Sequence, residues 1–283
     1  MSDYIFVSEK CLKKDIYPFL VDKLIEAGWE NVSSNPNTDF DVFYSTGMDR
    51  DKNLYFQMRP TNSNNTNSII DTDFCVMSLR LISNYTPNEQ GQSGTFERDR
   101  ESWRDVYLAP VSNSTRINYE TEVTIYYHVN KNRLIFSIVY PIATGINPVT
   151  HYIGIPDEIY VLEPDSKGLL YVSSTSNPAG NNGVLITDNI YSVTGSTSAV
   201  TRSVYFNLAP KNPNADGYYF LSEALYGNSS EGIRGKLTGL YFLPNENIIS
   251  EDIIQIGEKS FKVIVNGNYG NNGFPSHAVA FQI

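Results

Sequence analysis

The chain has 283 residues, 41% of them hydrophobic, so it is long enough to bury a large core in one domain or two modest ones. Its 31 acidic and 21 basic residues give a net charge of −10, which argues against a protein that grips nucleic acid through phosphates, because such proteins carry a basic face. Charged residues make up only 18%, and 20 Tyr and 14 Phe accompany many Asn, Ser, Thr and Gly residues, a mixture that favours strands joined by polar turns.

One helix is predicted near residues 15–28. Asp15 is a candidate N-cap, and Pro18 lies in the first turn, where its missing N–H costs little. Gly28 offers a C-terminal stop. Apolar residues recur between them at helical spacing: Ile16, Phe19, Leu20, Leu24 and Ala27.

Most of the remaining chain is predicted to form strands. The clearest signal is a hairpin, in which 123–129 and 134–140 flank a tight turn at 130–132. Another hairpin is predicted from 41–44 and 54–58. Further strands are expected near 74–82, 151–155, 169–173, 184–187, 203–208, 217–221, 237–243, 252–256, 260–265 and 277–282.

Short strands with regular turn signals predict a mainly β fold. We expect residues 1–65 to form a small N-terminal helix-plus-hairpin unit and residues 66–283 to form a sandwich- or barrel-like β body. No apolar run reaches the length of a membrane span, and the first residues lack the basic flank and apolar stretch of a signal peptide.

Three polar segments, 61–68, 86–102 and 175–183, have few apolar residues to bury and are expected to be loops that contact neighbouring subunits. Trp103 and Arg104 follow the longest of them, and this pair of residue types is typical of interface hot spots. They are the candidate inter-subunit contact. The alternative is that Trp103 anchors its own loop to the core.

No catalytic, cofactor-binding or metal-binding residues are predicted. The three histidines, His128, His151 and His277, lie in strand-like contexts without metal-ligand spacing, so each is expected to be structural. Cys11 and Cys75 are expected to be reduced thiols. Because no nucleophile motif is present either, we expect no enzymatic activity, although a glycosidase-like acid pair assembled from distant residues stays open.

Three parts of the chain resemble proteins of tailed-bacteriophage particles. The first is 126–135, an aromatic strand and tight turn leading to an Arg-apolar strand, together with the Tyr-Ile-Gly-Ile-Pro segment at 152–156. The second is the Arg-Gly-Lys-Leu-Thr-Gly-Leu-Tyr run within 232–242, and the third is the hairpin pattern at 252–264. The resemblance covers less than half of the chain and includes no catalytic residue.

This resemblance implies a virion structural protein that is made in the bacterial cytoplasm. The role it implies is a ring-forming neck, collar or tail component at the head–tail region. Its partners would be copies of itself and other virion proteins, with no sequence-specific nucleic acid, no membrane and no cofactor. The alternative is a baseplate, tail-tip or carbohydrate-binding receptor protein.

Overall fold

The structure is a computed structural model. It describes residues 4–33, 40–60, 75–82, 84–88, 94–97, 103–108, 118–140, 148–158, 170–173, 190–192, 214–228, 232–244, 247–265 and 277–283. These residues form a mainly β fold with one α-helix, as the sequence predicts. No helix in this part of the chain is both long and apolar enough to cross a membrane.

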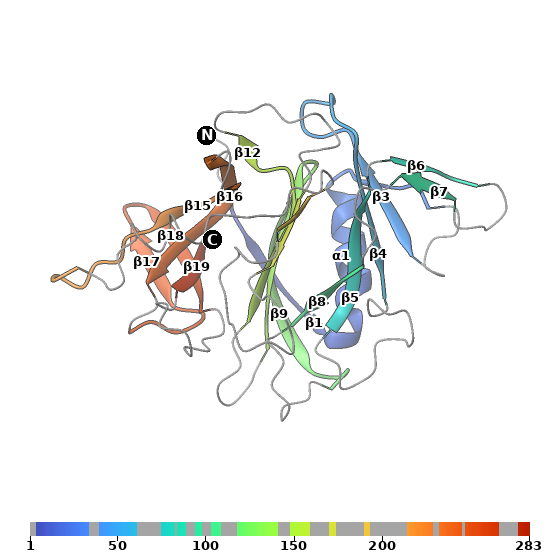
Figure 1. The fold of residues 1–283 in the computed structure, drawn as a ribbon. Coiled ribbons are helices and arrows are strands. Elements are labelled where there is room, and N and C mark those ends of the chain that lie inside the picture. Colours follow the sequence, from blue (N-terminus) through green and yellow to red (C-terminus); the bar gives the residue numbers. More distant parts are fainter. Residues whose placement is uncertain are drawn as a thin grey trace.

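The described strands form three large antiparallel sheets that lie in layers, and a separate two-stranded sheet (Figure 1). The central sheet has the order β1 (Val7–Leu12), β9 (Glu122–Asn130), β10 (Arg133–Val139), β11 (Val149–Gly154), β13 (Leu170–Ser173) and β14 (Ile190–Ser192). The C-terminal sheet has the order β12 (Asp157–Glu158), β16 (Gly232–Pro244), β19 (His277–Gln282), β18 (Lys259–Val265) and β17 (Ile253–Ile256), with β15 (Ser222–Asn228) also paired to β16. The N-terminal sheet has the order β2 (Glu30–Asn31), β3 (Asp41–Ser45), β4 (Leu54–Arg59), β5 (Cys75–Ile82) and β8 (Arg104–Tyr107).

The central sheet is apolar on both faces, and each face belongs to a different core. In β10, Leu134 and Phe136 point toward the helix and the N-terminal sheet. Ile135, between them, points toward the C-terminal sheet. Alternate side chains of a strand face opposite sides, so a strand buried on both sides reads as a continuous apolar run. The described strands therefore form stacked sheets and close no barrel.

The helix α1 (Ile16–Glu26) lies between the central and N-terminal sheets (Figure 1). Asp15 stands at the N-cap position, as predicted, but does not cap the helix, because a 3-10 turn (Lys13–Asp15) leads directly into it. Asp15 has a helical backbone and its side chain makes no capping hydrogen bond. At the other end Gly28 has a φ of +90°, which fits its predicted role as the stop.

The predicted hairpins are confirmed as β3–β4 and β9–β10, but two local predictions fail. The sequence pattern misses β1, because this edge strand is exposed on both faces from Val7 to Lys10 and so has no apolar periodicity. The strand predicted at 217–221 is irregular, because Asn214 Oδ1 accepts the backbone N–H groups of Asp216 and Tyr218. The strand there begins at Ser222.

Several predictions fall wholly or partly outside the described residues. They are the polar segments 61–68 and 175–183, the strands 184–187 and 203–208, and most of 86–102. The described part of 86–102 is not all loop, because β6 (Asn84–Thr86) pairs with β7 (Thr95–Glu97). The expected unit boundary after residue 65 falls between β4 and β5, which pair with each other.

Candidate functional site

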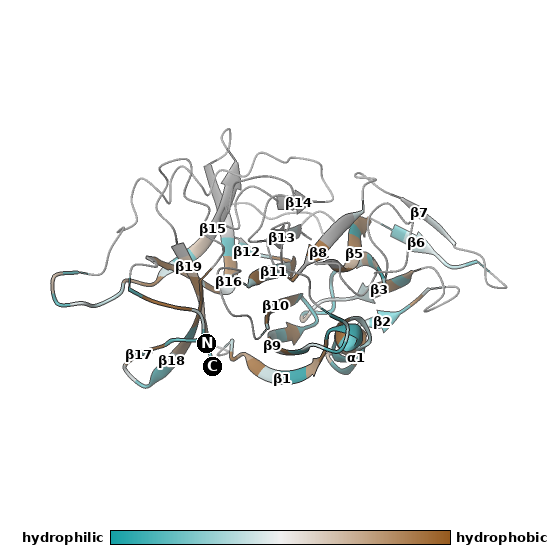
Figure 2. Cartoon of the chain, turned by 90° about the horizontal axis from the view of Figure 1, so that it is seen from below, coloured by the Kyte–Doolittle hydropathy of each residue, from teal (hydrophilic) through white to brown (hydrophobic). Residues whose placement is uncertain are grey.

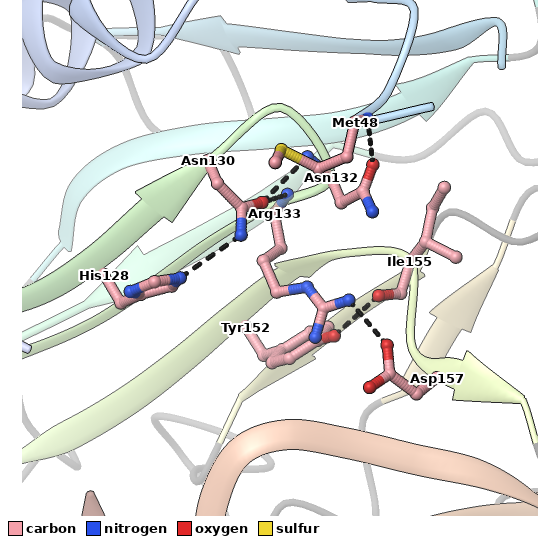
Figure 3. A network of polar contacts seen from close by, with 8 residues as sticks. All are labelled: Met48, His128, Asn130, Asn132, Arg133, Tyr152, Ile155 and Asp157. Atoms are coloured by element: carbon pink, nitrogen blue, oxygen red, sulfur yellow. Dashed lines mark hydrogen bonds and ion pairs between the residues drawn. The ribbon is translucent and has the colours of Figure 1, made fainter. Parts of the chain in front are cut away.

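A network of polar contacts surrounds Arg133, between the central and C-terminal sheets (Figure 3). Segments that the sequence singles out meet here. Arg133 begins β10, its register partner on β11 is Gly154, and Asp157 lies on β12, which pairs with β16. The N-terminal segment closes the site, because the guanidinium carbon of Arg133 lies 5.2 Å from the centre of the Tyr4 ring.

The β9–β10 turn fixes the proton position on His128 (Figure 3). Asn130 Oδ1 accepts the backbone N–H groups of Asn132 and Arg133 at 2.9 and 3.1 Å, so its amide nitrogen must point away from the turn. That nitrogen lies 3.2 Å from Nε2 of His128 and can only donate to it. The imidazole proton is therefore on Nδ1, which donates to the carbonyl of Ile5 at 3.2 Å.

This arrangement keeps His128 neutral. Burial of the ring lowers the pKa of His128, the nearby Arg133 cation lowers it further, and the bond to Ile5 only partly offsets them. Protonation at Nε2 would also set two donors against each other, because Asn130 already donates to that atom. His128 is thus a structural link between the turn and the N-terminal segment.

Arg133 is a buried cation with one described acidic partner. The residue is 1% exposed, and its Nη2 donates to Asp157 Oδ1 at 2.8 Å. Its Nε and Nη1 are buried and have no hydrogen-bond partner among the described residues. A buried guanidinium with two unbonded nitrogens is costly, which leaves the Asp157 carboxylate as its main electrostatic support.

Gly154 is required beside Arg133. A Cβ atom at this glycine would lie 2.3 Å from Cβ and 2.6 Å from Cα of Arg133. The flanking residues of the Tyr-Ile-Gly-Ile-Pro segment also have local roles, because the Tyr152 hydroxyl donates to the carbonyl of Ile155 at 2.8 Å. The geometry thus gives this motif a packing function.

Asp157 connects the buried network to an open cleft of about 310 Å³. Burial alone would raise the pKa of its carboxyl, but the nearby hydroxyl of Thr238 and the Arg133 cation outweigh that effect and lower it. Across the cleft Lys236 pairs with Glu223 at 2.7 Å. The cleft is lined by Tyr4, Asp157, Glu223, Ala224, Lys236, Leu237, Thr238, Gly239, Leu240, Tyr241, Lys259 and Gln282.

This site can bind polar groups, and its described geometry contains no nucleophile paired with a base. Among the described residues, no group of three or more His, Cys, Asp and Glu side chains is arranged to hold a metal ion. Cys11 is a free thiol whose pKa burial raises to about 11, so it is not poised as a nucleophile. His151 is fully buried, with Nδ1 3.0 Å from the Tyr171 hydroxyl, whereas the side chain of His277 lies outside the described part.

Trp103 makes none of the contacts of this network and packs instead against Arg59 and Arg80 of the N-terminal sheet. Its ring centre is 4.0 Å from the guanidinium carbon of Arg59 and 4.5 Å from that of Arg80, and the Phe40 ring is 6.2 Å away. The indole is partly buried. Arg104 begins β8, opposite Leu79, and its side chain is outside the described part.

Sequence reasoning misses the Arg133 site itself. Its members come from three separate stretches of the chain, and the local signals, an arginine after a tight turn and the Tyr-Ile-Gly-Ile-Pro segment, do not show that these stretches meet. No protein-family model matches the chain, and no curated protein sequence matches it. The resemblance to phage particle proteins therefore stays a prediction.

Proposed function

We propose that this chain is a structural subunit of a tailed-bacteriophage particle, without enzymatic activity of its own. The proposed role is a ring-forming neck, collar or tail component at the head–tail region, in contact with copies of itself and other virion proteins. After synthesis in the bacterial cytoplasm it would reside in the virion. The proposal rests on the sequence resemblance, and the way the polar side chains are used is consistent with it.

The observation that supports this role best is the distribution of exposed apolar side chains. Ten large hydrophobic residues are exposed in the described chain, and six of them belong to the C-terminal third: Tyr218, Phe220, Ile249, Ile253, Ile256 and Ile283. The hydroxyl of Tyr219 bonds to the Asn247 carbonyl, so these segments are neighbours. Clustered exposed apolar residues are typical of surfaces that other proteins cover.

The polar groups, in contrast, serve the fold. The Arg133 network joins the N-terminal segment, the β9–β10 turn and β12. Trp103 and Arg104 remain our proposed inter-subunit contact. The partly buried Trp103 ring can hold its own sheet together through Arg59 and Arg80 and still present an edge to a neighbour.

The composition of purified particles tests this proposal. Quantitative mass spectrometry of virions from the phage that encodes the chain should find it in multiple copies. Limited proteolysis should cleave residues 86–102 faster in the free protein than in the particle. Absence of the chain from purified particles would contradict the structural role. Equal protection of residues 86–102 from proteolysis in the free protein and in the particle would contradict the proposed inter-subunit contact.

A second candidate function is carbohydrate recognition by a receptor-binding virion protein. The cleft favours it, because two tyrosines, two carboxylates and the Gln282 amide line one opening, and aromatic faces with planar polar groups are suited to sugars. Binding of purified protein to a glycan array, lost on Tyr241→Ala, would favour this candidate. A chain that binds no glycan but is present in particles would favour the structural role.

A further inference from the structure

The strand β17 is the outer strand of a hairpin at the edge of the C-terminal sheet. It forms a hairpin with β18 through a two-residue turn at Gly257 and Glu258, and Gly257 has the positive φ of +60° that such turns need at their first position. The hairpin projects from the body of the molecule in Figure 2, with β17 on its outer side. Among the described strands β17 pairs with β18 alone.

The hairpin register fixes which backbone groups point outward. Ile256 and Lys259 bracket a two-residue turn and are therefore a hydrogen-bonded pair, as is Ile254 with its partner on β18. The bond from Val263 N–H to the Asp252 carbonyl, at 2.9 Å, follows the same alternation, in which the even-numbered residues bond to β18. The N–H and C=O groups of the odd-numbered residues Ile253 and Gln255 consequently face the open edge.

This edge lacks the protection that proteins usually give to exposed strands. Its sequence is Ile-Ile-Gln-Ile, with no proline and no charge. By contrast β1, the exposed edge of the central sheet, carries Glu9 and Lys10. Charges and prolines on edge strands prevent pairing with other chains. Ile253 is 57% exposed and Ile256 is 45% exposed, so β17 presents apolar side chains together with backbone groups that pair with no described strand.

We propose that β17 pairs with β17 of a second copy in an antiparallel, two-fold symmetric contact that makes the C-terminal sheets of the two copies continuous. A two-fold axis perpendicular to the sheet leaves each face of the sheet on the same side in both copies, so residues opposite each other point to the same face. Because side chains alternate between faces along a strand, the numbers of two opposite residues are both odd or both even. With the axis on Gln255, its outward N–H donates to the C=O of Gln255 in the second copy, and its outward C=O accepts from the N–H of that residue. Ile253 then pairs with Gly257 of that copy.

This register also matches the side chains. It sets Ile254 opposite Ile256 of the second copy, and Ile256 opposite Ile254, in the non-hydrogen-bonded positions where side chains are closest. Other centres on this strand place an isoleucine opposite Asp252 or Glu258. The second copy is therefore the occupant that the strand fits, because the same four residues supply both halves of the contact.

Charge at the turn gives the register a further check. Antiparallel pairing brings the turn that carries Glu258 and Lys259 near the start of β17 of the second copy, where Glu251 and Asp252 lie. Lys259 is then attracted to these carboxylates and Glu258 is repelled. The contact goes beyond the proposed function, because it holds whether or not the chain is part of a virion.

Sedimentation equilibrium of the full chain tests the contact with a matched pair of variants. Wild type should dimerise with a dissociation constant of about 1–10 μM, as is common for a small interface. Gln255→Pro removes the outward N–H and leaves the backbone bonds to β18 in place, and it should weaken dimerisation about tenfold or more. It also removes the side-chain bond from Ser260 Oγ on β18 to Gln255 Oε1, which Gln255→Ala removes equally. Gln255→Ala keeps the N–H and should dimerise like wild type. Wild type that is monomeric at about 100 μM, or a dimer indifferent to Gln255→Pro, would overturn the proposal.

Cross-linking and charge reversal test the register itself. Thiols introduced by Gln255→Cys face each other across the axis and should form a dimer of twice the chain mass under mild oxidation, whereas those from Ile253→Cys are too far apart. Wild type controls for the native cysteines. Glu258→Lys should tighten the dimer and Lys259→Glu should weaken it, each several-fold at low salt. Equal cross-linking at both positions, or no response to either charge reversal, would reject the register.

Discussion

Removing Asp157 should destabilise the chain more than removing Arg133, although either change eliminates the same ion pair. Asp157→Ala leaves the 1% exposed guanidinium buried without its acid. Loss of one partner of a buried pair costs about 3–5 kcal/mol. Because the Asp157 side chain is 50% exposed, water already weakens this pair, and we expect a loss of about 2–3 kcal/mol.

Arg133→Met has a smaller expected cost because it also removes a penalty. The methionine keeps most of the aliphatic volume and eliminates Nε and Nη1, which have no partner among the described residues. An unsatisfied buried donor costs about 1–3 kcal/mol, so its loss offsets much of the lost ion pair. We expect a net destabilisation below about 1 kcal/mol.

Urea unfolding followed by tryptophan fluorescence measures both changes. Trp29 is buried and its indole N–H donates to the Asn130 carbonyl at 2.8 Å, so it reports on this turn. Glu223→Ala is the control, because it breaks an exposed pair with Lys236 and should cost about 0.5 kcal/mol or less. An Arg133→Met loss equal to or greater than the Asp157→Ala loss would refute the account of this site.

Three further changes test other parts of the structure. Gly154→Ala should lower the free energy of unfolding by about 2 kcal/mol or more, because the new Cβ meets the Arg133 backbone. Gly217→Ala is the control, because the space around Gly217 is open, and it should cost about 1 kcal/mol. Similar losses for the two variants would contradict the packing role of Gly154. Because the pKa of His128 is lowered in the folded state, its contribution to stability is present above its ordinary pKa of 6.5 and is lost as the pH falls through its folded-state pKa. Wild type should therefore lose more stability than His128→Gln between pH 7.5 and pH 5. Parallel curves of unfolding free energy against pH for the two proteins would disprove this. With a pKa of about 11, the Cys11 thiol of a Cys75→Ser variant should react with iodoacetamide at pH 8 much more slowly than a free thiol, and equal rates would contradict its burial.

The local predictions succeed where a short stretch of sequence decides the structure. The β9–β10 hairpin follows from two β-rich runs around an Asn-Lys-Asn turn, and the end of α1 follows from Gly28. Prediction fails where non-local pairing decides. The strand β1 is held by β9, more than 100 residues away, and its exposed side chains leave no pattern to read.

The Arg133 site could not be predicted for the same reason. Arginine is rarely buried, so its place after a tight turn favours an exposed position. Its burial depends on Tyr4 and Asp157, which reach it from another segment and another sheet edge. By contrast, Gly154 and Tyr152 are visible in the sequence as a motif, and only the fold shows that the glycine makes room for the Arg133 backbone.

The central proposal, that the chain is a structural subunit of a phage particle, is tested most directly by cryo-electron microscopy of the phage particles to which the proposal assigns it. The account predicts several copies in a ring at the neck or along the tail, with the Trp103 region against a neighbouring chain. A reconstruction in which every protein of the neck, tail and baseplate is assigned and this chain is absent would contradict it.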